Sequence, residues 1–293
     1  MHFTRPIPWA IAATVLASAA TPSLAEETAS FSVNTEVKFT TDQRSRGVSD
    51  SLNGPGMKLS VQAVHESGLV GLAEFATVSR KQFLDGAGLG VTLAGGYRFG
   101  DPEGWHYGAG LAAELFPGAK FQAPHGFDMG TGAPTDWRST KYDSAFAVAE
   151  IGYGALEARV MNVISKTYRG ANTGGVCGTM VSLMADPTPG LACYARGDHN
   201  SRGSWLFDLG YKYALNPTTT VNLHAGYQKI ANFKEADFSD YSIGVTHKRW
   251  GFHWSAEWMT TRTRVRELYI ALDGTRLRAT DNNRLVVSVS RSF

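Results

Sequence analysis

Apolar and polar residues alternate along much of this chain, in segments of roughly ten residues separated by turn-rich stretches. In FSVNTEVKF, residues 31–39, Phe, Val, Thr, Val and Phe alternate with Ser, Asn, Glu and Lys. The same alternation recurs in residues 88–100, 105–115, 205–213, 221–228, 241–248, 252–258 and 284–293. Successive side chains of a strand point to opposite faces, so each segment predicts a strand with one apolar and one polar face.

Four further segments show a weaker pattern. MKLSVQAV (57–64) alternates well, and LEARVM (156–161) is short. LVGLAEFATV (69–78) and SAFAVAEIGY (144–153) are apolar on both faces, so we assign them as strands mainly by their spacing. The chain therefore predicts about twelve strands.

The connections between these segments alternate in length. Short turns fall at 65–68, 100–104, 152–155, 215–219 and 248–251, whereas longer polar or glycine-rich loops fall at about 42–55, 79–87, 116–141, 165–204, 229–239 and 260–283. A soluble sandwich has no reason to sort its loops by length. An even number of strands with loops sorted in this way predicts an all-β, antiparallel up-and-down transmembrane barrel, with short periplasmic turns and long extracellular loops.

Aromatic residues gather where the predicted strands begin and end. The apolar faces at the short-turn ends carry Phe31, Phe99, Trp105, Tyr213, Phe252 and Phe293, and the opposite ends carry Phe39, Tyr227, Tyr241 and Trp258. Membrane barrels place aromatic girdles at the two interfaces of the bilayer. Aromatics scattered through a soluble core do not predict this clustering, so the pattern favours the barrel.

The amino-terminal residues predict the compartment. A basic start at Arg5, an apolar run from about Ile7 to Ala20 and the triplet Ser23-Leu24-Ala25 are typical of a secretory signal peptide cleaved after Ala25. The run is shorter than the roughly 20 residues that a spanning helix needs, which argues against an uncleaved anchor. We therefore expect residues 1–25 to be a signal peptide for the Sec pathway and residues 26–293 to form one barrel domain in the bacterial outer membrane.

Charge and cysteine content narrow the possible functions. The chain has 28 Lys and Arg against 26 Asp and Glu, so it lacks the clustered basic charge that nucleic-acid binding requires. Its two cysteines, Cys177 and Cys193, predict a disulfide in an exported protein rather than a metal site or a catalytic thiol. Such a bridge stabilises by roughly 3 kcal/mol in the chain-entropy model, and we expect it to stiffen the long loop around it.

The last segment, RLVVSVSRSF, ends on a bare phenylalanine. A closing strand carries its lipid-facing side to the very end of the chain, with Leu285, Val287 and Val289 on that side. A terminal aromatic after alternating apolar residues resembles the signal read by the bacterial barrel-assembly machinery. Arg291 departs from that pattern, but it lies near the headgroup level, where a charge costs little.

Residues 41–79 resemble the opening signature of the TorF family of putative porins. The similar elements are Asp42, Arg46-Gly47-Val48-Ser49, Pro55 and His65-Glu66-Ser67-Gly68. Residues 205–228, 237–258 and 282–293 are similar to that family's later strands. Gln43 stands where the family pattern has an aromatic, and the insert around the cysteines is particular to this chain. The resemblance implies an outer-membrane channel and implies neither a substrate nor catalytic residues.

Twelve tilted strands give a backbone radius of about 12 Å and a lumen on the order of 10 Å across before any loop folds in. Charged residues of both signs fall on the polar face and are candidates to line it: Glu36, Lys38, Arg46, Lys58, Glu74, Arg98, Glu114, Asp208, Lys212 and Glu257. One hypothesis is a water-filled path whose charges orient small polar or charged solutes. The alternative is that opposite charges pair and plug the interior. The many Gly, Ala and Ser residues at inward positions favour the open path.

Three arginines, Arg262, Arg264 and Arg266, alternate beyond Trp258. On a strand extended past the membrane they continue the outward face, where they could bind lipopolysaccharide phosphates bidentately. The equally simple alternative is that they are solvated loop charges.

Catalytic, metal-binding and cofactor sites find little support. GAGLG (86–90) is too short for a nucleotide-binding loop, and the inward His106, His224 and His253 come from separate strands. The outward His247 lies near the short-turn end, the wrong leaflet for an outer-membrane phospholipase. We predict a passive channel for small solutes without a cofactor, surrounded by lipid and lipopolysaccharide. The alternatives are a closed barrel with a surface-interaction or structural role through its long loops, and an outer-membrane hydrolase.

Overall fold

The computed structural model describes residues 31–128 and 130–293, and the expected signal peptide lies outside them. Within the described residues, twelve antiparallel strands close into a barrel, because β1 pairs with β4 on one side and with β18 on the other. The strands are β1 (Phe31–Thr40), β4 (Gly56–His65), β5 (Leu69–Thr77), β6 (Leu89–Gly100), β7 (Trp105–Leu115), β10 (Ser144–Tyr153), β11 (Leu156–Val163), β12 (Trp205–Asn216), β13 (Thr219–Lys229), β14 (Phe238–Arg249), β15 (Phe252–Thr263) and β18 (Arg284–Ser292). The barrel and the strand number expected from the sequence are confirmed.

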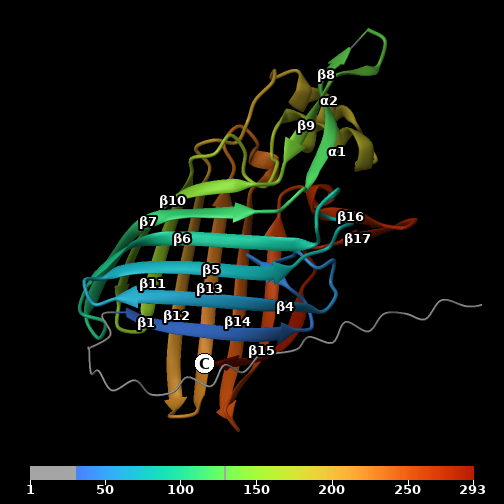
Figure 1. Cartoon of the computed structure of the whole chain (residues 1–293). Helices are drawn as coiled ribbons and strands as arrows, with labels where there is room; N and C mark the ends of the chain where they lie inside the picture. Colours follow the sequence, from blue (N-terminus) through green and yellow to red (C-terminus); the bar gives the residue numbers. More distant parts are fainter. Residues whose placement is uncertain (1–30, 129) are drawn as a thin grey trace, which may run out of the picture. The chain divides into compact units, whose positions relative to one another are not determined.

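Each strand pairs with the barrel strands before and after it in the sequence, so the topology is up-and-down. In Figure 1 the wall formed by β4–β7 runs at a steep angle across the wall formed by β12–β15. The pairing keeps the two-residue period in register around the wall. For example, Phe39 lies opposite Met57 and Val289, whereas Lys38 lies opposite Lys58 and Ser290. The apolar positions of all strands therefore share one face of the wall, and the polar positions share the other.

The apolar face is the outer one. Large side chains such as Leu93, Leu111 and Ile243 are exposed around the wall, with exposed fractions of 43–61%. The aromatics expected at the strand ends lie on this face too, and all of them are exposed except Phe252, which is half-buried. A continuous exposed apolar wall of this size is not stable in water, and its natural solvent is lipid.

The connections alternate in length as expected, with short turns at one end of the barrel and long loops at the other. Smaller elements that the sequence pattern did not predict lie within the long loops: β2 (Arg44–Ser45), β3 (Val48–Ser49), β8 (Lys120–Asp128), β9 (Ala133–Lys141), α1 (Thr173–Leu183), α2 (Thr188–Tyr194), η1 (Lys234–Ala236), η2 (Arg266–Tyr269), β16 (Ile270–Asp273) and β17 (Arg276–Ala279). Figure 1 shows β8, β9, α1 and α2 gathered beyond the barrel at the loop end.

A buried hydrophobic core lies at this loop end rather than in the middle of the barrel. Phe146, Val163 and Leu206 are inward residues at the loop ends of β10, β11 and β12. They pack with residues of the long loops, namely Tyr168, Val176, Cys177, Met180, Cys193, Tyr194, Ile230, Phe233 and Ala236. The long loops are therefore folded onto the barrel mouth on the side of β10–β13. No described helix is both long and apolar enough to cross a membrane.

Candidate functional site

The barrel encloses a cavity of about 360 Å³ on the side of β4–β7 and β10–β12. Small residues of β6 and β7 leave room for it, because Ala94, Gly96, Gly108, Gly110 and Ala112 line its wall. Charged side chains of both signs share the lining: Arg46, Glu74, Arg98, Glu114, Glu150, Arg159 and Asp208. The cavity is therefore wide enough for water and small solutes and is lined by groups that bind them.

The charges on the strands of this cavity are mostly paired with one another. The Lys58 ammonium lies 2.7 Å from Glu74 Oε1 across the β4–β5 pair. Glu150 accepts from two arginines, with distances of 2.8 Å to Arg98 Nη2 and 2.7 Å to Arg159 Nε. These pairs keep the wall nearly neutral while leaving polar atoms exposed to the lumen.

The first long loop, residues 41–55, folds into the mouth of the barrel. Asp42 and Arg44 form a fully buried ion pair at 2.7 Å, and Ser49 donates a hydrogen bond to Asp42 Oδ1 at 2.6 Å. Arg44 Nη1 also donates to the carbonyl of Asn282, and the Ser49 amide donates to the carbonyl of Thr280. The loop is thus held on the loop that precedes β18.

The β2–β3 hairpin of this loop places Arg46 inside the barrel. Arg46 Nη1 donates to Asp208 Oδ1 at 2.6 Å, and Nη2 donates to the carbonyls of Phe207 and Tyr227 at 3.0 and 3.1 Å. Asp240 Oδ1 lies 4.0 Å from the same Nη2, and the Asp240 side chain is 2% exposed. A loop residue therefore joins β12, β13 and β14 from within the lumen.

His224 extends this cluster along β13. Its Nε2 lies 2.8 Å from Asp240 Oδ2 and 3.8 Å from Asp208 Oδ1. Arg46, Asp208, Asp240 and His224 thus form one group of interior charges, here called the Arg46 cluster. Three buried polar atoms around it have no hydrogen-bond partner among the described residues: Arg46 Nε, Asp240 Oδ1 and Thr261 Oγ1.

A second interior group lies at the mouth beside β7. Arg169, from the loop after β11, donates to Asp50 at 2.8 Å and to Glu114 on β7 at 2.9 Å. Burial works to lower the pKa of the Arg169 guanidinium, but the Asp50 and Glu114 carboxylates outweigh it and hold that pKa well above its usual range. Burial also raises the pKa of the Asp50 carboxyl, and the neighbouring Arg169 opposes that shift. Arg169 therefore stays charged and ties the loop after β11 to the barrel wall.

The ten lumen candidates all occupy inward positions. Glu36 accepts from Ser290 at 3.2 Å, and Glu257 accepts from the Ser242 hydroxyl at 2.5 Å. Arg46 reaches the interior from a loop. The other nine project from barrel strands and share the polar register of the wall: Glu36, Lys38, Lys58, Glu74, Arg98, Glu114, Asp208, Lys212 and Glu257. That these residues line a conducting pore stays a prediction.

The sequence pattern missed several charged interior residues, among them Glu150, Arg159, Asp240 and Arg169. Glu150 lies on the segment 144–153, which is apolar on both faces, and Arg159 lies on the short segment 156–161, so their register was not read. Asp240 falls one residue before the segment predicted as a strand, because β14 begins at Phe238. Arg169 lies on a long loop, where no periodicity signals which way a side chain points. The period-two count extended through Glu150 and Arg159 would have found those two.

The three arginines beyond Trp258 do not form the expected row. Their alternation predicts one extended strand through Arg262, Arg264 and Arg266, but β15 ends at Thr263 and η2 begins at Arg266. Arg262 is outward and exposed on β15. Arg264 Nε lies 3.6 Å from Asp237 Oδ2, and Arg266 Nε lies 3.4 Å from Asp281 Oδ1. Two of the three are therefore paired with carboxylates, because the chain turns inward to pack on the mouth.

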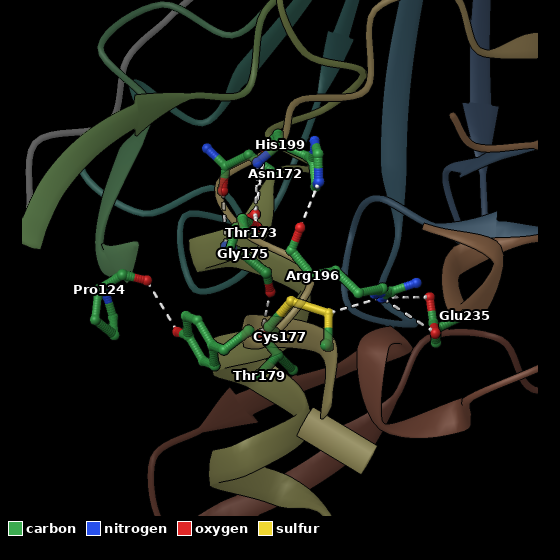
Figure 2. Close-up of a disulfide and its surroundings, with 12 residues drawn as sticks. Pro124, Asn172, Thr173, Gly175, Cys177, Thr179, Arg196, His199 and Glu235 are labelled. Carbon is green, nitrogen blue, oxygen red and sulfur yellow. Dashed lines mark hydrogen bonds and ion pairs between the residues drawn. A yellow bond between two sulfur atoms is a disulfide. The ribbon is translucent and has the colours of Figure 1, made fainter. Parts of the chain in front are cut away.

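The predicted disulfide between Cys177 and Cys193 is present and joins α1 to α2, with 5.4 Å between the two Cα atoms. Figure 2 shows its surroundings, where Arg196 Nη2 lies 3.2 Å from Glu235 in the loop after β13. The Tyr194 hydroxyl donates to the carbonyl of Pro124 on β8 at 2.9 Å. The bridge thus stiffens a folded lobe rather than an irregular loop. Among the described residues no group of three or more His, Cys, Asp or Glu side chains could hold a metal ion.

Comparisons with known proteins place the chain in a bacterial family. A family model described as "Bacterial protein of unknown function (Gcw_chp)" matches residues 24–293. The match does not carry the TorF name, so the resemblance to that family stays a prediction. No curated protein matches the chain at a significant level.

Several solved outer-membrane barrels are distantly similar to the chain. The KdgM porin is 9% identical, with 89% of this chain and 99% of that chain covered and a TM-score of 0.47. The NanC porin is 7% identical, with coverages of 88% and 98% and a TM-score of 0.48. The COG4313 outer membrane channel from Pseudomonas putida F1 is 11% identical, with coverages of 94% and 100% and a TM-score of 0.38.

Proposed function

The chain belongs to the Gcw_chp family of bacterial proteins, and we propose that it works as a porin-like channel of the bacterial outer membrane. The observation that carries this proposal is a charge-lined cavity of about 360 Å³ inside a closed barrel whose outer wall is apolar. An apolar exterior suits lipid, and a polar interior suits water and small solutes. Small polar or charged solutes would diffuse passively through the lumen, filtered by size and by its charged side chains.

The proposal includes the route and the orientation of the protein. Residues 1–25 act as a Sec signal peptide, the short turns face the periplasm and the long loops face outward, surrounded by lipid and lipopolysaccharide. The closing strand β18 ends on Phe293, which the barrel-assembly machinery would recognise. Of the three arginines proposed to contact lipopolysaccharide phosphates, Arg262 fits best, because it is outward and exposed on β15.

Planar lipid bilayers test the channel directly. We expect the purified protein to produce discrete, steady current steps in KCl, and replacement of K⁺ or Cl⁻ by larger ions to reveal its preference. Silence of the folded protein across voltages and salt concentrations would contradict the proposal.

A pair of variants makes the same test specific to the lumen. Ala94 lines the cavity, whereas the neighbouring Leu93 is exposed on the outer wall. Ala94→Trp is expected to reduce the current step because its ring fills the cavity. Leu93→Trp adds a similar ring on the lipid side and is expected to leave the step unchanged.

The second candidate function is a closed barrel that acts through its outer loops. The paired interior charges and the inserted β2–β3 hairpin favour this alternative, because both reduce the free cross-section of the lumen. It predicts no conductance for the native protein and a binding partner for the lobe of β8, β9, α1 and α2. An outer-membrane hydrolase is the third alternative, and ester hydrolysis in mixed micelles tests it.

A further inference from the structure

The β2–β3 hairpin lies inside the barrel next to the cavity, on the side of β12–β15. Its tip, Arg46-Gly47, lies against β12–β15, whereas the cavity faces the small residues of β6 and β7. Arg46 itself belongs to the cavity lining, together with Ser45 and Asp208. A passing solute has the Arg46 cluster on one side and, on the other, the small Ala and Gly residues of β6 and β7 beside the paired Arg98, Glu150 and Arg159.

The hairpin tip is packed too closely to swing freely. Arg46 and Gly47 both adopt left-handed backbone conformations, with φ of 50° and 74°. A Cβ atom added to Gly47 would clash with the Thr261 hydroxyl and come within 2.9 Å of Asp240 Cβ. The base of the hairpin is held by the buried Asp42–Arg44 pair and by bonds to residues 280 and 282. The Arg46 guanidinium is therefore held at a fixed place in the lumen.

The carboxylates at this place outnumber the guanidinium. One guanidinium faces the two carboxylates of Asp208 and Asp240, and His224 lies beside both. The side chains of Arg46 and Asp208 are 9% and 18% exposed, so both reach the lumen surface. Removal of Arg46 would leave both carboxylates uncompensated, whereas removal of Asp208 would leave Arg46 opposed by Asp240 alone.

From these contacts we propose that the β2–β3 hairpin is a fixed constriction of the channel and that Arg46, opposed by Asp208 and Asp240, determines its ion selectivity. This inference rests on the proposed channel function and adds the residues that filter its solutes. The constriction discriminates by charge because it brings passing ions close to the Arg46 guanidinium and the Asp208 carboxylate, with little water between them.

Reversal potentials across a KCl gradient in planar bilayers test the assignment. Arg46→Gln leaves the Asp208 and Asp240 carboxylates without their guanidinium, so the ratio of K⁺ to Cl⁻ permeability should rise about threefold or more, as expected for one unit charge near the ion path. Asp208→Asn removes one of the two carboxylates that face Arg46 and makes the local charge one unit more positive, so the ratio should fall by a similar factor. Arg46→Lys keeps the charge and should stay near the native ratio.

An arginine outside the lumen serves as the matched control. Arg276→Gln removes the same charge from the exposed β16–β17 hairpin and should leave the permeability ratio unchanged. The shift of the barrel band on unheated gels shows that each variant is folded. Opposite shifts for Arg46→Gln and Asp208→Asn support the inference, since a purely structural role does not reverse its sign with the charge removed.

The other outcomes separate this inference from the channel itself. If the native protein conducts and both folded variants keep its permeability ratio, the hairpin is not the selectivity site, although the channel stands. If the native protein and every folded variant are silent, the channel function fails and the constriction fails with it.

Discussion

Arg46 and Gly47 together fix the β2–β3 hairpin inside the barrel. Arg46 bonds to Asp208 and to two carbonyls of the wall, and Gly47 lets the turn fit beside Thr261. The sequence offered Arg46 as a lumen candidate, but its partners lie more than 160 residues away and no local pattern names them. Residues on strands were easier, because the period of two gives the direction of each side chain.

We expect Gly47→Ala to displace the hairpin tip from its contacts with the barrel wall. A left-handed conformation costs an L-residue about 1–2 kcal/mol, and here the added methyl group also clashes with Thr261. Trypsin should cut the reconstituted variant after Arg44 and Arg46 faster than it cuts the native protein. Gly203→Ala is the control, because Gly203 has φ of 82° and no neighbour within 4 Å of its added Cβ. Equal cleavage of the two variants would show that the contact with Thr261 does not hold the tip.

Among the secondary-structure elements, the strands and the order of short and long connections were predictable because both are local properties of the sequence. The helices α1 and α2 were not, since their segment is rich in glycine and proline. Asn172 caps α1 by accepting a hydrogen bond from the Gly175 amide, and Val176, Cys177 and Met180 bury its apolar side. Tertiary packing and the disulfide thus override a weak helical propensity. The end of β15 at Thr263 was not predictable either. There Arg264 and Arg266 contact Asp237 and Asp281, and these are tertiary contacts that no local pattern shows.

Removal of the disulfide should loosen the α1–α2 lobe without opening the barrel. A bridge across 16 residues stabilises by about 3 kcal/mol in the chain-entropy model. Trypsin should therefore cut after Arg196 faster in the variant with both Cys177→Ser and Cys193→Ser, while the unheated gel band of the barrel persists. Ser182→Ala, a change on the same helix that keeps the bridge, should behave like the native protein. Loss of the barrel band in the double variant would show that the lobe is needed for barrel folding.

The whole molecule is a closed wall, and closure depends on the end of the chain. The Phe293 amide donates to the carbonyl of Thr35 at 2.8 Å, while its ring is 70% exposed. Arg291 lies over the rings of Phe252 and Phe293, at 5.6 and 5.1 Å from their centroids. The closing hydrogen bonds use only the backbone of Phe293, so its ring is free for recognition. The sequence predicted this closing strand from its alternation and its terminal aromatic.

We expect Phe293→Ala to lower the amount of folded protein in the outer membrane of cells severalfold, through loss of the assembly signal. The melting temperature of the purified, refolded variant in detergent should change little, because the backbone bonds to Thr35 remain. Trp250→Ala removes another exposed aromatic at the short-turn end and should assemble normally in cells. Normal assembly of Phe293→Ala would show that the terminal ring is not the signal.

We propose that one face of this wall meets water and the other meets lipid. Single cysteines placed alternately on neighbouring strands test it, since a thiol reacts with a charged, membrane-impermeant reagent only where water reaches it. In liposomes, cysteines at the inward Gly210 and Asn222 should be modified, whereas cysteines at the outward Leu209 and Leu223 should be protected. Equal modification at all four positions, or protection of the inward pair alone, would contradict the barrel in lipid and the channel proposed for it.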